Sequence, residues 1–406
     1  MNASASSTSR PRRVTVLGST GSIGRGALDV VSRLPDRLEA FGLSAQRSID
    51  LLAEQTLRFQ PRVVALADSS QVGALRERLG SGWRGELLSG PDASEQLAGL
   101  SEADVVLNGL VGAAGLLPTR AALRAGRAVA LANKESLVIA GAAITREADR
   151  AGVQLLPVDS EHSGIFQLLQ GAPTDGRGGT TPPARLLRRM ILTASGGPFR
   201  TRDLSTFASI RPEEALKHPT WAMGPRITID SATLLNKGFE LLEAHWLFRL
   251  PPEQIEVWVH PQSIVHGLVE WADGSTTAQL SLPDMRIPIQ IALCHPERCD
   301  AGLPGCDLTR IGRLEFEAPE ESRYPCLGLA RRALAEGGTA PAVLNAADEV
   351  IVQAFLDGRI SFPEIAETLE RVLDQRPSDR GDEVEQLLEA DAWARQRAAA
   401  ILVLSR

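Results

Sequence analysis

The 406-residue sequence lacks several features that define other classes of protein. No stretch of about 20 residues is free of charge, so no membrane-spanning helix and no membrane partner is expected. The net charge of −7 argues against nucleic acid as the main partner, although a local basic pocket can still bind phosphate. The 43% hydrophobic and 23% charged residues are typical of a soluble globular protein, and the length suggests two or three domains.

Cysteine is also scarce. The four cysteines fall between Cys294 and Cys326, contain no C-x-x-C pair, and have one nearby histidine, His295. This spacing is not typical of a zinc site. We therefore expect reduced thiols in a cytoplasmic protein.

The first 13 residues lack an apolar core segment, which argues against a secretory signal. Their Ser- and Arg-rich, acid-free composition loosely resembles that of a transit peptide, but the segment is very short. We interpret residues 1–13 as a disordered tail.

From Val14 onward, short apolar runs alternate with amphipathic helical stretches. The predicted strands lie at residues 14–17, 38–43, 62–67, 104–107, 128–131 and 154–158. Strands that alternate with helices indicate a parallel, doubly wound sheet. We predict an α/β fold whose N-terminal domain, residues 14–158, has a Rossmann-like sheet.

The regular alternation stops near Val158. Residues 159–294 contain strand-like runs at 188–193, 255–259 and 276–281 and are interpreted as a central α/β catalytic domain, with a surface loop at 171–183. Residues 295–320 hold several Gly and Pro and are predicted to be a linker. Residues 321–406, rich in Ala, Leu, Glu and Arg, are predicted to form a small C-terminal helical domain.

A glycine-rich segment follows the first predicted strand and opens the first helix: Gly18, Ser19, Thr20, Gly21, Ser22, Ile23 and Gly24. Glycines let the backbone approach a pyrophosphate, and a helix N-terminus offers free N–H groups. The spacing is G-x-x-G-x-x-G rather than G-x-G-x-x-G, and a tight turn without a ligand is the alternative.

The end of the second strand indicates which dinucleotide is bound. An NAD enzyme often has a carboxylate there, whereas this chain has Ala45, Gln46, Arg47 and Ser48. A guanidinium and hydroxyl groups suit the 2′-phosphate of NADP, so NADP is favoured over NAD. Arg47 could instead be a solvated residue at the start of a helix.

Two carboxylates, Asp159 and Glu161, come just after the predicted strand at 154–158, where catalytic groups of open α/β sheets gather. Close carboxylates repel one another unless a cation neutralises them, and oxygen ligands favour Mg²⁺ or Mn²⁺. The alternative is that Asp159 or Ser160 only caps the following helix.

A second group of polar residues lies at 231–240. Ser231, Asn236 and Lys237 are donors suited to a phosphate, and Glu240 could complete a three-carboxylate site. The alternative is a solvated salt bridge between Lys237 and Glu240, which are three residues apart on one helix face. A donor-rich turn at Ser195 to Pro198 could form a further anion site.

The segment from Lys217 to Pro225 is bounded by Pro and Gly and contains His218, Trp221 and Met223. A tryptophan in a loop often anchors a core. The functional alternative is a lid whose indole covers the substrate and excludes water.

Taken together, these segments resemble the 1-deoxy-D-xylulose 5-phosphate reductoisomerase family over nearly the whole chain. Further matching stretches are 131–137, 157–162, 193–199, 260–266, 283–286 and 344–350. The resemblance implies an NADPH-dependent enzyme that rearranges the carbon skeleton of 1-deoxy-D-xylulose 5-phosphate with the help of a metal. NADPH then reduces the product to 2-C-methyl-D-erythritol 4-phosphate, a step of non-mevalonate isoprenoid synthesis.

The resemblance also implies roles for individual residues. The metal ligands are expected to be Asp159, Glu161 and Glu240, which with Lys134 and His218 form the predicted catalytic set. Predicted substrate-binding residues are Ser160, Ser195, His218, Trp221, Ser231, Asn236 and Lys237. Asn133, Glu135 and Met285 join the glycine-rich loop and residues 45–48 as predicted cofactor-binding residues.

The sequence departs from the family pattern at three positions. Gln46 and Ser48 stand where family members tend to have Gly and Asn, and Asp348 stands where Asn is usual. The family also implies a homodimer. The alternatives to this function are an NADP-dependent dehydrogenase of another small phosphorylated carbonyl compound and a non-catalytic dinucleotide sensor. A semialdehyde dehydrogenase is disfavoured because no Cys occupies a strand-to-helix turn.

Overall fold

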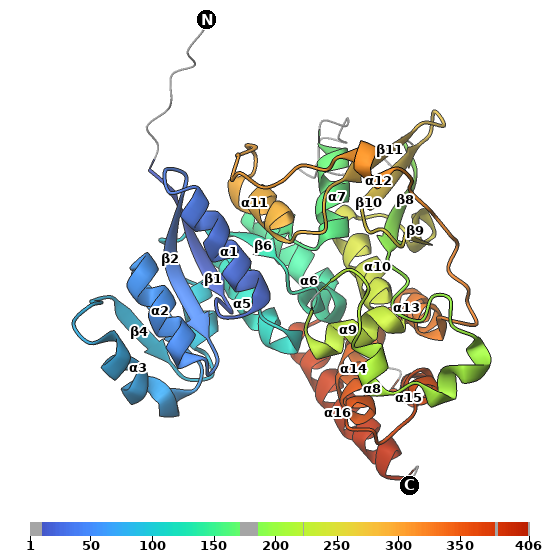
Figure 1. The fold of residues 1–406 in the computed structure, drawn as a ribbon. Helices are drawn as coiled ribbons and strands as arrows, with labels where there is room; N and C mark the ends of the chain where they lie inside the picture. Colours follow the sequence, from blue (N-terminus) through green and yellow to red (C-terminus); the bar gives the residue numbers. More distant parts are fainter. Residues whose placement is uncertain (1–9, 171–185, 222, 378–380, 405–406) are drawn as a thin grey trace, which may run out of the picture. The chain divides into compact units, whose positions relative to one another are not determined.

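The computed structural model describes residues 10–170, 186–221, 223–377 and 381–404 (Figure 1). The predicted surface loop at 171–183 and residues 1–9 of the predicted tail lie outside the described residues. Packing divides the chain into two compact units. Unit 1 comprises Met1–Asn133, Glu147–Val158 and Met285–Leu303, and unit 2 comprises Lys134–Arg146, Asp159–Asp284 and Pro304–Arg406.

Unit 1 is built on a seven-stranded parallel sheet in the order β4-β3-β2-β1-β5-β6-β7. Its strands are β1 (Arg12–Leu17), β2 (Leu38–Ala45), β3 (Val63–Leu66), β4 (Glu86–Ser89), β5 (Val105–Asn108), β6 (Ala128–Leu131) and β7 (Leu155–Pro157). All four residues of β3 and of β5 are buried, as expected for parallel strands that are covered on both faces. The parallel sheet predicted from the alternating pattern is therefore confirmed.

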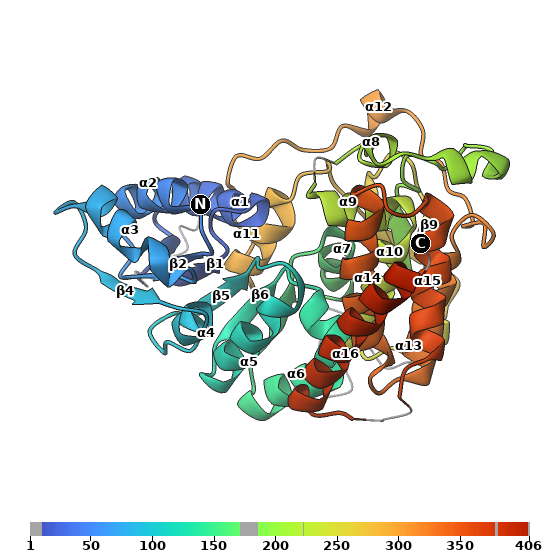
Figure 2. The same cartoon turned by 90° about the horizontal axis from the view of Figure 1, so that it is seen from below.

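Helices cover both faces of this sheet, with α1, α2 and α3 on one face and α4 and α5 on the other (Figure 2). The helices of unit 1 are α1 (Ser22–Arg33), α2 (Ile49–Phe59), α3 (Val72–Leu79), α4 (Ala93–Ala98), α5 (Leu116–Arg124) and α11 (Arg286–Cys294), with 3₁₀ turns at Ser69–Gln71 and Gly112–Gly115. The long helix α6 (Glu135–Ala151) contributes its first part to unit 2 and its last residues to unit 1.

Unit 2 contains a four-stranded sheet in the order β11-β10-β8-β9, in which only β8 and β9 run parallel. The strands are β8 (Leu187–Ala194), β9 (Ile255–Val259), β10 (Val265–Trp271) and β11 (Thr276–Leu280). Its helices are α7 (Ser160–Leu169), α8 (Pro212–Ala215), α9 (Pro225–Ala232), α10 (Leu235–Phe248), α12 (Leu308–Ile311), α13 (Pro325–Glu336), α14 (Ala340–Leu356), α15 (Phe362–Asp374) and α16 (Val384–Leu404), with 3₁₀ turns at Leu204–Ser209 and Pro252–Gln254.

The C-terminal helices form the helical region predicted from composition, and α14 lies beside α16 (Figures 1 and 2). Local sequence fixes their ends: α13 begins with Pro325, and Ser361 and Glu364 form a capping box at the start of α15. Phe362 packs edge-to-face against Phe199 at 5.3 Å between ring centroids. This contact ties the helical region to the segment after β8.

The packing units differ from the predicted domain boundaries, which followed chain order. Residues 285–303 belong to unit 1 because α11 packs on α1: Arg286 pairs with Asp29 at 3.0 Å, and a Cβ on Gly26 would lie 3.2 Å from Ile289. Residues 134–146 belong to unit 2, where Gly141 lies so close to Trp246 of α10 that a Cβ would come within 2.1 Å of the indole.

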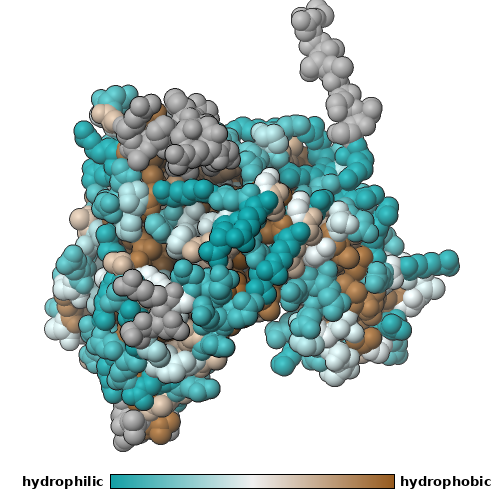
Figure 3. Space-filling view, turned by 180° about the vertical axis from the view of Figure 1, so that it is seen from behind, coloured by the Kyte–Doolittle hydropathy of each residue, from teal (hydrophilic) through white to brown (hydrophobic). Residues whose placement is uncertain are grey.

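The face of the molecule in Figure 3 is mostly hydrophilic, with smaller apolar areas between the polar ones. Among the described residues, no helix combines the length and apolar character needed to cross a membrane.

Candidate active site

The glycine-rich loop of unit 1 connects β1 to α1 in a conformation that requires its glycines. Gly18 has a φ of +72°, and a Cβ on Gly24 would lie 2.3 Å from the Gly18 carbonyl oxygen. Gly21, the N-cap of α1, places no side chain over the first turn, so the N–H groups there remain available to an anion. The loop follows β1 where the strand order reverses between β2 and β5, which is where open α/β sheets bind ligands.

The predicted adenosine-side residues follow β2. Gln46, Arg47 and Ser48 are exposed, whereas Ala45 is buried as the last residue of the strand. The Arg47 side chain is 75% exposed, and its Nε lies 3.5 Å from a carboxylate oxygen of Asp68, just beyond β3. The guanidinium is therefore held loosely, and cofactor binding by these residues stays a prediction.

The remaining predicted cofactor residues fall in different units. Asn133 is buried in unit 1, and its amide donates hydrogen bonds to the carbonyls of Leu110 and Gly112, at 3.0 Å each. It thereby fixes the loop that follows β5. Met285 precedes α11 in unit 1 and is partly buried, whereas Glu135 begins α6 in unit 2.

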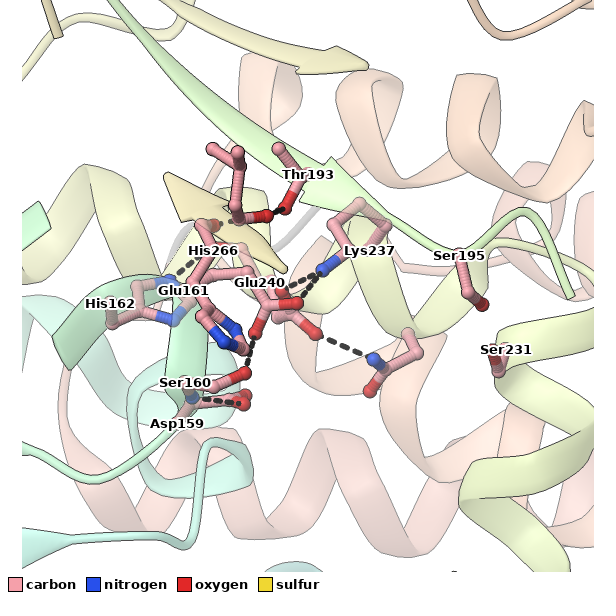
Figure 4. A network of polar contacts seen from close by, with 12 residues as sticks. Asp159, Ser160, Glu161, His162, Thr193, Ser195, Ser231, Lys237, Glu240 and His266 are labelled. Carbon is pink, nitrogen blue, oxygen red and sulfur yellow. Dashed lines mark hydrogen bonds and ion pairs between the residues drawn. The ribbon is translucent and has the colours of Figure 1, made fainter. Parts of the chain in front are cut away.

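Three predicted metal ligands meet in unit 2. Asp159 caps α7 by accepting a hydrogen bond from the Ser160 N–H, Glu161 lies in the first turn of α7, and Glu240 comes from α10. One carboxylate oxygen from each lies within 4.8 Å of the others (Figure 4). Asp159 is thus both a helix cap and a member of the cluster, so the two alternatives for it do not exclude each other.

Two buried lysines accompany the carboxylates. Lys134 Nζ forms ion pairs with Asp159 and, at 3.2 Å, with Glu240 Oε1, while Lys237 Nζ pairs with Glu240 and, at 2.9 Å, with Glu161 Oε1. The Lys237 and Glu240 side chains are 4% and 1% exposed. The alternative that these two residues form a solvated salt bridge is therefore wrong.

Neutral donors complete the cluster. Asn236 donates to Glu240 Oε1 at 2.5 Å and accepts from Lys134 at 2.9 Å, and the Ser160 hydroxyl donates to Glu161 Oε2 at 2.6 Å. The structure thus brings together seven predicted site residues whose positions span 106 residues of chain.

Burial and charge shift the titration of these groups. Burial, together with the charge of Glu161, raises the pKa of Glu240 to about 7. Burial is the largest single effect on Asp159 and Glu161 and would raise both pKa values. Nearby cations and hydrogen-bond donors, Lys134 foremost at Asp159 and Lys237 at Glu161, together outweigh burial, so both pKa values are lowered. The carboxylates carry more negative charge than the two ammonium groups neutralise, which favours an added cation.

The donor set fits a divalent hard metal. It consists of carboxylate oxygens on two helices, one from each of Asp159, Glu161 and Glu240, which lie within 4.8 Å of one another. All-oxygen ligands of this kind favour Mg²⁺ or Mn²⁺ over zinc.

Sequence reasoning missed two residues behind the cluster. His162 and Glu243 are fully buried, with His162 Nδ1 3.4 Å from Glu243 Oε2, and His162 Nε2 lies 2.8 Å from the Glu240 carbonyl oxygen. Glu243 follows Glu240 by three residues on α10, so helical spacing could have indicated that both face the same way. No local pattern indicated the role of His162, which supports the backbone of a predicted metal ligand.

A second polar group joins Ser195, His218 and Ser231. His218 Nε2 lies 3.0 Å from the hydroxyl oxygen of Ser195 and 3.0 Å from that of Ser231. Ser195 follows β8, where its hydroxyl also accepts from the Gly197 N–H, and Ser231 lies near the end of α9. In the view of Figure 4, Lys237 lies between Glu240 and Ser195.

The tautomer of His218 follows from its backbone contacts. Nδ1 accepts hydrogen bonds from the N–H groups of Thr220 and Trp221, at 3.2 and 2.9 Å, so the proton of the neutral ring is on Nε2. Burial lowers the pKa of His218 to about 4, which keeps the ring neutral near pH 7. Nε2–H donates toward the serine oxygens, and the serine protons can therefore point toward an anion.

Trp221 is partly buried, and its neighbour Ala222 lies outside the described residues. The core anchor and the lid both stay predictions for this side chain.

A parallel sheet with a glycine-rich strand-to-helix loop, together with a carboxylate cluster and a group of hydroxyl donors, defines a dinucleotide-dependent oxidoreductase that acts with a divalent metal. Models of three domains of one family match residues 14–141, 155–248 and 280–397. A 1-deoxy-D-xylulose 5-phosphate reductoisomerase from Aromatoleum aromaticum is 51% identical over 391 residues, which are 96% of this chain and 96% of that protein. The chain belongs to the 1-deoxy-D-xylulose 5-phosphate reductoisomerase family.

Solved structures agree with this assignment. The enzyme from Zymomonas mobilis in complex with NADPH is 43% identical, covers 97% of this chain and 99% of its own, and superposes with a TM-score of 0.88. A reductoisomerase in complex with NADPH, fosmidomycin and magnesium is 36% identical, with 97% and 98% coverage and a TM-score of 0.88. The predicted family, fold class and enzyme class are confirmed.

Proposed function

We propose that this chain converts 1-deoxy-D-xylulose 5-phosphate to 2-C-methyl-D-erythritol 4-phosphate, with Asp159, Glu161 and Glu240 as the ligands of a divalent metal. The observation that carries the residue assignment is the meeting of these three carboxylates within 4.8 Å, from two helices, beside two buried lysines. When bound, a divalent ion supplies electrophilic polarisation of the ketone and a neighbouring hydroxyl of the substrate, and NADPH supplies the hydride.

The two lysines have two roles in this proposal: they compensate the charge of the carboxylates, and they stabilise negative charge on the substrate. Asp159 and Glu240 outweigh the effect of burial and raise the pKa of Lys134 well above its usual range, so the side chain stays cationic. Lys134 and Lys237 then limit the repulsion among the carboxylates. Cationic donors at this point also suit the negative charge that grows on substrate oxygens during rearrangement.

Ser195 and Ser231 bind the substrate phosphate in this proposal, with Asn236 and Lys237 nearby on α10. His218 Nε2–H occupies an acceptor site of the hydroxyls, which leaves the serine protons for the phosphate. Binding of this remote group orients the reacting carbons, because it converts binding energy into correct placement. Ser160 and Trp221 are assigned to the same substrate.

The loop Gly18 to Gly24 binds the pyrophosphate of NADPH, and Arg47 faces its 2′-phosphate. Support comes from the uncapped first turn of α1 and from the absence of an acid at positions 45–48. The related enzymes described above bind NADPH in their structures. Asn133, Glu135 and Met285 remain proposed cofactor contacts.

The test is NADPH oxidation with 1-deoxy-D-xylulose 5-phosphate, with and without Mg²⁺ or Mn²⁺. We expect oxidation that depends on the metal and stops with excess chelator. Metal-independent oxidation would favour the alternative, a dehydrogenase of another phosphorylated carbonyl compound.

A variant pair tests the metal ligands. Glu240→Gln should abolish turnover and leave NADPH affinity unchanged, because Glu240 belongs to unit 2 and the proposed pyrophosphate loop to unit 1. The matched control is Glu256→Gln, which changes a glutamate of the same unit whose side chain is 37% exposed. Loss of NADPH binding in Glu240→Gln, or equal loss of turnover in both variants, would contradict the assignment.

The homodimer and the cytoplasmic location are part of the same proposal. Light scattering of the purified protein checks the first, and cell fractionation checks the second.

A further inference from the structure

One partly buried arginine of unit 2, Arg226, has no part in the proposed metal or phosphate sites. Arg226 is the second residue of α9, and its guanidinium donates to three residues of α14. Nε lies 3.0 Å from Asp348 Oδ2, Nη1 lies 2.9 Å from Glu349 Oε1, and Nη2 lies 2.9 Å from Asn345 Oδ1. Such a planar fork of donors holds its partners in a defined geometry.

The same guanidinium also faces two residues that adjoin the site. Nη1 lies 3.5 Å from Glu135 Oε1, and Nε lies 3.6 Å from Asp230 Oδ2. Glu135 directly follows Lys134, and Asp230 directly precedes Ser231. Arg226 therefore links the start of α6, the end of α9 and the middle of α14.

The network continues to the last helix. Glu349 uses its other oxygen to accept from Arg395 of α16 at 2.7 Å, and Arg395 pairs with Asp391 on the same helix. Ion pairs thus connect Arg226 of α9 through Glu349 of α14 to Arg395 of α16.

Two of these carboxyl groups, those of Asp230 and Asp348, are buried beside Arg226. Asp230 Oδ1 and Asp348 Oδ1 are both buried, and neither has a hydrogen-bond partner among the described residues. Burial and the charge of Asp348 raise the pKa of Asp230 well above its usual range, so Asp230 carries the proton and Asp348 pairs with Arg226. The acid at position 348, where the family usually has Asn, is accommodated in this way.

We propose that Arg226 is a positioning residue for the reaction, which holds Ser231 and Lys134 in place by fastening α9 and the start of α6 to α14. This inference rests on the proposed function of Ser231 and Lys134. Displacement of a binding group by about 1 Å can cost as much as 100-fold in rate, so a fastening outside the site has a measurable effect.

The experiment compares Arg226→Met and Arg226→Lys with wild type. For Arg226→Met we expect KM for 1-deoxy-D-xylulose 5-phosphate to rise about tenfold or more. The Ki of inorganic phosphate as a competitive inhibitor should rise in the same proportion. Arg226→Lys keeps the charge but not the fork, so both constants should lie between those of the other two proteins.

A purely structural role predicts a different outcome. Partial unfolding lowers the concentration of active enzyme, and hence the apparent kcat, but leaves KM and Ki of the folded molecules unchanged. Unchanged KM and Ki in folded Arg226→Met would overturn the inference. The matched control is Arg332→Met. It removes the ion pairs of Arg332 with Glu336 of α13 and with Asp374 of α15, and it should change neither constant.

Removal of Arg226 alone leaves buried acids uncompensated, so the single variant can fail to fold. The double variant Arg226→Met with Asp348→Asn removes one cation and one anion together. A raised KM and Ki in the double variant supports the inference, and wild-type constants overturn it. Inactive wild-type protein would instead refute the proposed function, which keeps the two failures distinct.

Discussion

Substitution of Gly197 by alanine should destabilise the turn after β8 in two ways. The alanine would have to adopt a left-handed backbone conformation, and its Cβ would overlap the backbone of α9. Gly197 has a φ of +66°, and a Cβ would lie 2.8 Å from the Ser231 carbonyl oxygen and 2.9 Å from the Ala232 Cα. The left-handed conformation costs an alanine about 1–2 kcal/mol. Overlap with the backbone of α9 adds about 1–3 kcal/mol, since backbone atoms yield less readily than side-chain ends.

The matched control is Gly358→Ala. Gly358 has a φ of +69°, and no atom of the described residues would lie within 4 Å of its Cβ. It should therefore lose only the conformational part, about 1–2 kcal/mol. The difference between the two variants measures the contact alone.

The assay is urea unfolding monitored by tryptophan fluorescence. Of the six tryptophans, only Trp83 lies in unit 1, so the signal comes mainly from unit 2, which contains both substituted glycines. We expect Gly197→Ala to be less stable than Gly358→Ala by about 1–3 kcal/mol. KM for 1-deoxy-D-xylulose 5-phosphate should rise only in Gly197→Ala, since the displaced backbone carries Ser231. Equal stability of the two variants, or an unchanged KM in Gly197→Ala, would refute the reasoning.

Three further predictions concern packing, titration and thiol reactivity. Gly238→Ala should destabilise the protein by about 1–3 kcal/mol, because its Cβ would lie 2.4 Å from that of Ala330. In unfolding titrations, the added substitution Ala330→Gly should restore most of the lost stability. No recovery would argue against the contact. His218 has a folded pKa of about 4, below its ordinary value of 6.5, so the unfolded chain binds more protons and stability falls as pH drops from about 6.5 to about 4. Unfolding titrations at several pH values should give a shallower fall for His218→Asn at equal metal concentration, and identical pH profiles would be the contrary result. Burial raises the pKa of Cys294 to about 12 and that of Cys326 further. An aromatic disulfide reagent at pH 8 should therefore modify both thiols only after unfolding. Rapid labelling of either thiol in the native protein would count against their burial.

The sheet of unit 1 could be predicted because its central strands are short runs of buried apolar residues between helical stretches. Val63–Leu66 and Val105–Asn108 are buried throughout. The edge strand Glu86–Ser89 was not predicted, since none of its residues is buried and its apolar run is two residues long. Strand signals in sequence come from burial, which an edge strand largely lacks.

The candidate site also contains residues that local sequence indicates and residues that it does not. Asp159 and Glu161 were found because they follow a strand, and Glu240 because it shares a helix face with Lys237. The ion pair of Lys134 with Glu240, which joins residues 106 positions apart, arises from tertiary packing and has no local signal. The prediction of Lys134 as a site residue came from the family resemblance instead.

The backbone contacts of His218 have a consequence for cooperativity. Nδ1 is held by the amides of Thr220 and Trp221, and Nε2 holds the hydroxyls of Ser195 and Ser231, so one ring joins the loop to the anion site. An anion that engages the hydroxyls stabilises this loop conformation, and by linkage the ordered loop strengthens anion binding by the same free energy. Mutations in the loop backbone therefore act on phosphate affinity without touching the phosphate.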